Sequence, residues 1–174
     1  TTITKLATEK FEVGGHMGHA IPRIGSTKGM LVGGLRYITW AFLKMNDGFG
    51  FTSYLKHLQA SQLPYDLEYE VDAWGCTHAH LLGNAMQLLG FGVPLSHAAQ
   101  MGLGMYPPKN DAHHREAFEF ALANEWVETL FETGAEPQRN HLGQYYPKEK
   151  DNHKMLYEIT RLKEQGSKYN WLSR

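Results

Sequence analysis

The sequence predicts an all-α protein in which one short transmembrane helix precedes a small helical domain with extended arms. Three observations support this fold class. A mostly apolar run occupies residues 30–43, apolar residues recur every three or four positions downstream, and glycines or prolines end these stretches. We divide the chain into an extended segment with glycines and histidines (1–28), a membrane-anchor helix (29–47), a helical domain (48–134), and a loop, amphipathic helix and aromatic tail (135–174).

The first segment is rich in residues that disfavour regular structure. Gly14, Gly15, Gly18 and Pro22 predict an extended or looped conformation over residues 13–28. The two histidines at positions 16 and 19 invite a metal hypothesis, but a histidine pair in a loop without matched further ligands is a weak motif. We therefore interpret this segment as a flexible connection to the helix that follows.

The apolar run at 30–43 has two interpretations. A membrane span usually needs about 20 apolar residues, and a central arginine costs about 2.5–3.5 kcal/mol, which nearly cancels the apolar gain. If the run crosses a membrane, Arg36 must be paired or must snorkel to an interface, and Gly33 and Gly34 let a neighbouring backbone approach closely. Otherwise it is a buried core helix with Arg36 at its edge.

A series of short motifs over residues 14–51 favours the interpretation of this run as a membrane span. In order they are Gly14-Gly15-His16, Pro22-Arg23, Thr27-Lys28-Gly29-Met30, Trp40 and Asn46-Asp47-Gly48. The pattern resembles the small single-span accessory subunits in the membrane arm of mitochondrial complex I. The resemblance implies a non-catalytic accessory or assembly subunit of a respiratory complex in the mitochondrial inner membrane. Its partners would be other subunits, with lipid around the anchor helix, and it would hold no cofactor of its own.

Composition narrows the remaining classes of function. The 17 basic and 18 acidic residues nearly balance, so no electrostatic footprint for nucleic acid is present and no nucleic-acid partner is expected. The single cysteine, Cys76, excludes a disulfide framework and a CxxC site. The chain starts at Thr1 without a basic and apolar leader, which fits an N-terminus trimmed by removal of a transit peptide.

Downstream, periodicity and stop signals predict four helices. They cover residues 51–63 before Pro64, a long amphipathic helix over 67–89, a helix from a cap at Asn110 or Asp111 to Gly134, and a last one from Asp151 to Gly166 with Met155, Leu156, Ile159 and Leu162 inward. Residues 73–108 contain no charged side chain, which predicts burial by this chain or by partner subunits. The tail SKYNWLSR, with Tyr169, Trp171 and Leu172, is a predicted anchor to a partner.

One cluster supports a different hypothesis, a soluble all-helical enzyme with a non-haem metal. It is Cys76-Thr77-His78-Ala79-His80. On a helix His78 and His80 point to opposite sides, so a shared metal would need His113 or His114 and an acid, Glu116 or Asp72, from elsewhere. No matched di-iron set is present. We therefore favour an interior His78 beside Trp74 and a His80 that faces solvent or an interface, and we assign no catalytic, cofactor-binding or metal residue.

Overall fold

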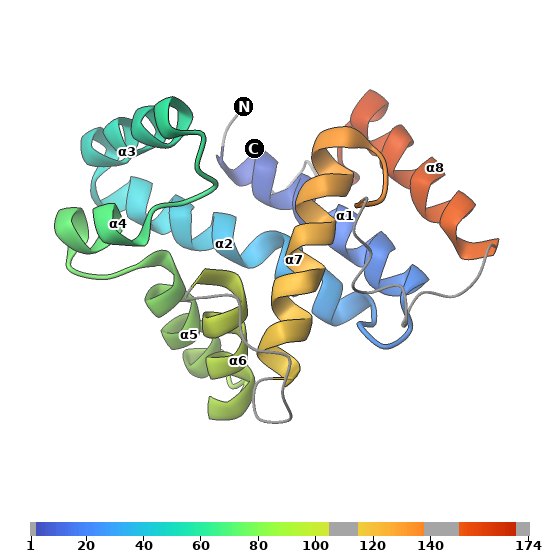
Figure 1. Cartoon of the computed structure of the whole chain (residues 1–174), viewed down its shortest axis with the longest axis horizontal. Helices are drawn as coiled ribbons and strands as arrows, with labels where there is room; N and C mark the ends of the chain where they lie inside the picture. Colours follow the sequence, from blue (N-terminus) through green and yellow to red (C-terminus); the bar gives the residue numbers. More distant parts are fainter. Residues whose placement is uncertain (1–2, 105–114, 138–149, 170–174) are drawn as a thin grey trace.

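The computed structural model describes residues 3–104, 115–137 and 150–169, and all regular structure among them is helical, which confirms the all-α class. The helices, shown in Figure 1, are α1 (Ile3–Ala20), α2 (Ser26–Asn46), α3 (Gly48–Ser61), α4 (Leu67–Trp74), α5 (His78–Leu88), α6 (Val93–Gly104), α7 (Arg115–Thr133) and α8 (Lys150–Gln165).

Helices α1 and α2 form an antiparallel hairpin at the centre of the molecule (Figure 1). Glycines make their close approach possible. A Cβ atom added to Gly14 would lie 1.9 Å from the carbonyl oxygen of Gly29, and one added to Gly33 would lie 2.0 Å from that of Lys10. The two backbones are therefore in direct contact, and any side chain at these positions would force the helices apart.

The structure differs from the expectation of an extended segment over residues 1–28. Helix α1 continues through Gly14, Gly15 and Gly18 to Ala20, and only residues 21–25 form the turn before α2. Glycine weakens an isolated helix, but here its missing side chain allows a packed partner helix. Tertiary packing therefore overrides the local propensity.

The predicted anchor over 29–47 falls within α2, but the structure does not support a span. One side of α2, with Val32, Leu35 and Arg36, is buried against the rest of the chain. Across the described ranges, no helix combines the length and the apolar character that crossing a membrane requires. The arginine that made the run marginal as a span is 2% exposed and is bound by other parts of the chain.

The long helix predicted over 67–89 is two helices. Gly75 adopts φ 70° at the end of α4, a left-handed conformation that glycine tolerates without strain. Thr77 then caps α5, and its side chain accepts a hydrogen bond from the His80 backbone N–H. The apolar periodicity continues across this break, so periodicity alone does not reveal it.

Other helix ends agree with the predictions. Helix α3 ends at Ser61, before Pro64, and α7 and α8 end before Gly134 and Gly166, which adopt φ 73° and 79°. Met155, Ile159 and Leu162 face inward from α8, as predicted, whereas Leu156 is only partly buried against the core. The predicted caps Asn110 and Asp111 and the tail residues Trp171 and Leu172 lie outside the described residues.

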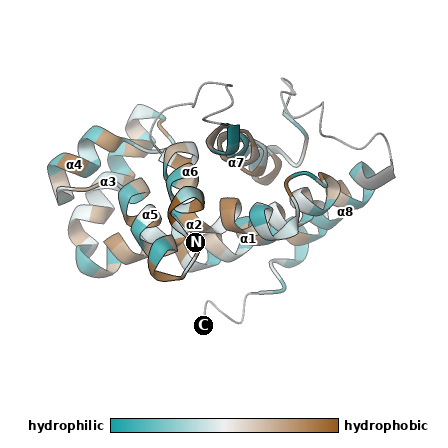
Figure 2. Cartoon of the chain, turned by 90° about the horizontal axis from the view of Figure 1, so that it is seen from below, coloured by the Kyte–Doolittle hydropathy of each residue, from teal (hydrophilic) through white to brown (hydrophobic). Residues whose placement is uncertain are grey.

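Two clusters of buried residues make up the core. The larger joins the α1–α2 hairpin to α5, α6, α7 and α8, and the smaller is an aromatic cluster around Trp40, Phe51 and Tyr54 beneath α3 and α4. Helices α3 and α4 lie at one end of the molecule and α8 at the other (Figure 1). Hydrophilic and hydrophobic residues alternate along the labelled helices (Figure 2), as expected where each helix has an inner and an outer side.

Candidate functional site

A buried acid–base pair joins α4 to α5. Neither Glu70 nor His78 exposes any surface, and His78 Nδ1 lies 2.8 Å from each carboxylate oxygen of Glu70. The His78 backbone N–H donates to Glu70 Oε2 over 2.7 Å, and the Tyr54 hydroxyl donates to Oε1. Each carboxylate oxygen therefore has donors, which is the condition under which a charge is tolerated in a core.

The surroundings of Glu70 favour its ionised form. Burial by itself raises the pKa of this carboxyl, but the hydrogen bonds and charge of His78, together with the Tyr54 hydroxyl, outweigh it, and the pKa lies below its usual range. On the other side of the imidazole ring, His78 Nε2 lies 3.2 Å from the carbonyl oxygen of Leu103. Both ring nitrogens face acceptors, so both must carry hydrogen for both contacts to be hydrogen bonds.

The Leu103 carbonyl extends this chain of contacts to α2. It accepts a second hydrogen bond, of 2.8 Å, from the Arg36 guanidinium, whose central carbon lies 4.6 Å from the centre of the Tyr65 ring. Arg36 also lies 4.0 Å from the carboxylate of Glu128 on α7. The arginine inside the apolar run thus links the α5–α6 pair to α7.

Lys10, on α1, is the last member of this series of contacts. Its ammonium group contacts the Tyr37 hydroxyl and the Glu128 carboxylate, and the residue is only 4% exposed. Burial lowers the pKa of Lys10, while the charge of Glu128 opposes this shift. The same burial raises the pKa of the Tyr37 hydroxyl.

We call this set of side chains the buried polar network: Lys10, Arg36, Tyr37, Tyr54, Glu70, His78 and Glu128. Its contacts connect α1, α2, α3, α4, α5 and α7, and its charged groups are mostly occupied by one another. We therefore assign the network a structural role, which is to fix the register of the helices. Sequence reasoning did not find it, because its partners are as far apart as 118 positions. Arg36 within an apolar run and the predicted interior His78 were the available signals.

The structure does not bring together most of the ligands that the metal hypothesis requires. Among residues 3–104, 115–137 and 150–169, no group of three or more histidine, cysteine, aspartate or glutamate residues is arranged to hold a metal ion. His78 is interior, as predicted, but its nitrogens are engaged by Glu70 and Leu103, and its aromatic neighbours are Trp40 and Tyr65.

The remaining predicted ligands do not meet His78 in the described residues. His80 Nδ1 lies 3.0 Å from the Thr77 hydroxyl in the cap of α5. Asp72 is exposed, and Glu116 lies 3.1 Å from Lys28 Nζ on another part of the molecule. His113 and His114 lie outside the described residues, so their part in this hypothesis stays a prediction. Cys76 is partly exposed.

A group of exposed apolar side chains lies near the junction of α2 and α3. We call it the corner patch, and it consists of Ile38, Phe42, Met45 and Phe49, with exposed fractions of 55%, 56%, 85% and 87%. The spacing of the first three places them on one face of α2, opposite the face that packs on α1. Phe49 follows in the first turn of α3. Side chains of this size are seldom exposed together unless they contact another molecule.

A second group of exposed apolar residues lies at the turn from α5 to α6. Leu88, Leu89 and Val93 are 89%, 71% and 64% exposed. They belong to the charge-free stretch over 73–108, for which burial was predicted. Other residues of that stretch, among them Leu82, Met86 and Leu103, are buried by this chain. Within this chain the prediction of burial therefore holds for part of the stretch only.

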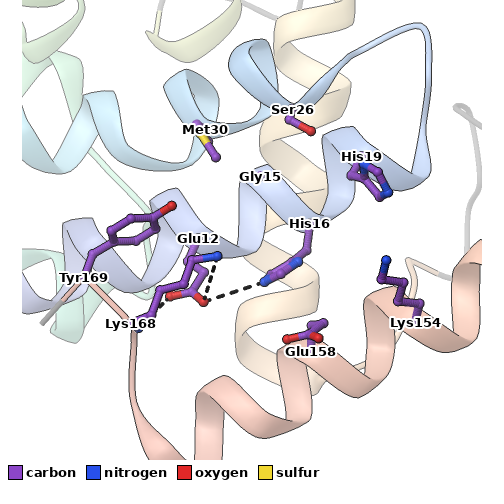
Figure 3. A pocket seen from close by; sticks show the side chains of 10 residues that line it. All are labelled: Glu12, Gly15, His16, His19, Ser26, Met30, Lys154, Glu158, Lys168 and Tyr169. Atoms are coloured by element: carbon purple, nitrogen blue, oxygen red, sulfur yellow. Dashed lines mark hydrogen bonds and ion pairs between the residues drawn. The ribbon is translucent and has the colours of Figure 1, made fainter.

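A cavity of about 270 Å³ lies between α1 and α8, and Ser26 and Met30 of α2 form a further part of its wall. His16 and His19 line it from α1, Lys154 and Glu158 from α8, and Lys168 and Tyr169 from the residues after α8 (Figure 3). Glu12 closes one wall, where its carboxylate accepts hydrogen bonds from the Ser167 hydroxyl and the Lys168 backbone N–H. The histidines that the sequence analysis placed in a flexible segment thus lie in a pocket with other charged groups.

Comparisons with protein-family models, with curated proteins and with solved structures find no match to this chain. The resemblance over residues 14–51 therefore stays a prediction. In the structure these residues form the second half of α1, the turn, α2 and the start of α3. Gly14 and Gly29, two of the positions that carry the resemblance, are at the contact between the two helices.

Proposed function

We propose that this protein is a non-catalytic accessory or assembly subunit of a larger protein complex. The observation that carries the proposal is the corner patch, with its four large apolar side chains more than half exposed. Exposed patches of this kind on a folded chain mark protein contacts, and phenylalanine and methionine are enriched at such interfaces.

The energetics favour a protein partner over permanent exposure to water. Burying a phenylalanine, isoleucine or methionine side chain stabilises a complex by about 1.5–3 kcal/mol relative to leaving it in water. Full burial of Met45 and Phe49, which are almost entirely exposed, would contribute several kcal/mol before the costs of association. We therefore commit to an apolar surface of a neighbouring subunit as the occupant of the corner patch.

The setting that we propose is a respiratory complex of the mitochondrial inner membrane. Its support is the resemblance of residues 14–51 to accessory subunits of complex I. In this proposal α2 serves as a contact helix, because one side packs on α1 and the other carries the corner patch. The contribution of the subunit is structural, since covering apolar surface stabilises an assembly without any reaction.

The test is isolation of the full chain from its native source in mild detergent, followed by sizing and identification of co-purifying proteins. We expect a defined assembly with fixed stoichiometry in the mitochondrial membrane fraction. Recovery as a free monomer, or as an oligomer of this chain alone, would contradict the proposal. A defined assembly outside mitochondria would retain the accessory role and overturn the respiratory setting.

A further inference from the structure

We propose that the cavity between α1 and α8 binds a small organic anion through its carboxylate or phosphate group. This inference uses a face of the molecule distinct from the corner patch and does not depend on the proposed function. At about 270 Å³ the cavity is slightly smaller than the usual range for ligand pockets, which begins at about 300 Å³. It suits a metabolite of few atoms rather than a nucleotide or a peptide.

The charges around the cavity favour an anion. Lys154 and Lys168 line the cavity together with two carboxylates, Glu12 and Glu158. Arg161 lies beside both carboxylates, and the two histidines add charge when they are protonated. The carboxylates are already occupied. Arg161 lies 2.8 Å from Glu158 and 3.7 Å from Glu12, Lys168 Nζ lies 3.8 Å from Glu12, and Glu12 also accepts from two groups at 167 and 168. Among the described residues Lys154 is the cation of this set without a carboxylate partner, so its charge is available to a ligand.

Several donors at the cavity have no partner within the described part of the chain. They are the Lys154 ammonium group, the His19 ring and the hydroxyls of Ser26 and Tyr169. Lys154 and His19 come from opposite walls, on α8 and α1, and both point toward the space between them (Figure 3). Donors that converge from two elements on one cavity give the geometry that orients a carboxylate or phosphate.

His16 makes binding sensitive to pH. Its half-buried ring has Nε2 3.6 Å from Glu12 without a hydrogen bond, and Glu158, Lys168, Lys154 and His19 also border the same space. Burial and the charge of Lys168 lower the pKa of His16, so its ring is mainly neutral at pH 7. An anion in the cavity favours the protonated ring, and binding therefore strengthens as pH falls from 7.5 to 6.

The experiment follows the histidine ring signals of the full chain by NMR, at constant ionic strength. Inorganic phosphate and succinate are titrated separately, so that the tighter of the two identifies the preferred head group. We expect the His16 and His19 signals to shift and saturate, while the His57 signal on α3 stays in place. Sulfate, whose charge is constant between pH 6 and 7.5, tests the pH dependence.

Two matched variants test the site. Lys154→Gln removes a cationic wall residue, and we expect binding to weaken about tenfold or more, the loss of one charge-assisted hydrogen bond. Lys56→Gln removes another exposed lysine, on α3, and binding is expected to be unchanged. Shifts that never saturate with any of the three anions, or an equal loss in both variants, would overturn the proposal.

Discussion

At the scale of single residues, we expect the largest loss of stability on disruption of the buried pair of Glu70 and His78. We expect Glu70→Gln to lower the free energy of unfolding by about 3–5 kcal/mol, because it replaces a fully buried carboxylate that accepts from Tyr54 and the His78 backbone and contacts the His78 ring. Urea unfolding measures the change. Asp72→Asn, on the same helix but exposed, is the control and is expected to change stability by less than about 0.5 kcal/mol. Equal effects of the two variants would refute the role of the pair.

Glu70 also determines part of the change in folding stability at acid pH. Its pKa is lower in the folded state than in the unfolded chain, so its contribution is complete above the ordinary carboxyl pKa of 4.5. That contribution is lost as pH falls through the lower, folded value. Unfolding free energies measured between pH 6 and 3 are expected to fall less steeply in Glu70→Gln than in the unchanged chain.

His16 acts in the same direction as Glu70, in a higher pH range. Burial lowers the pKa of this ring below the ordinary value of 6.5, so the unfolded chain binds the proton more readily than the folded one. Stability due to His16 therefore decreases as pH falls below about 6.5. We expect His16→Gln to flatten the stability profile from pH 7.5 to 5.5, whereas His153→Gln, at an exposed position on α8, leaves the profile unchanged.

At the scale of elements, the molecule depends on the glycines between α1 and α2. We expect Gly29→Ala to destabilise the fold by at least about 3 kcal/mol, the upper end of the range for overpacking, since the new Cβ meets the Gly14 backbone at 2.0 Å. Gly48→Ala is the matched control, because no atom lies within 4 Å of its added Cβ in the first turn of α3. The control is expected to be neutral or slightly stabilising. Thermal unfolding of both variants gives the answer, and a fully stable Gly29→Ala would contradict the packing.

These elements also show what the sequence reveals. The stops at Gly134 and Gly166 were predictable because a helix end depends on a few adjacent residues. The helical state of Gly14 and Gly18 was not, because glycine is a helix breaker locally and is favoured here only by a partner helix. Gly75 was missed for a related reason, since it interrupts the backbone but not the apolar periodicity.

At the scale of the whole molecule, the buried polar network lies where distant segments of the chain meet. The sequence predicted an interior His78, yet it did not indicate Glu70, because pairing across the turn at Gly75 depends on where the helix breaks. The contact of Lys10 with Glu128 requires the complete arrangement of α1, α2 and α7. The corner patch was hidden for the same reason, since an apolar run does not show which of its sides is covered.

The position of α2 in the molecule explains why its sequence resembles a membrane span. Its buried side meets α1 and its outer side carries the corner patch, so both sides are apolar and the run lacks the polar face of an ordinary surface helix. Apolar residues on both sides of a helix give the same composition whether they meet protein or lipid. The proposed function therefore requires a partner at the corner patch.

The most direct test compares native assemblies formed by three versions of the full chain: unchanged, Phe42→Ser with Met45→Ser, and Tyr157→Ser. Tyr157 is 67% exposed on α8 and serves as the control for loss of an exposed aromatic side chain. We predict that the corner-patch variant folds with unchanged stability but separates from its assembly on sizing, whereas the control stays bound. Retention of the corner-patch variant in the assembly at the unchanged level would contradict the central claim.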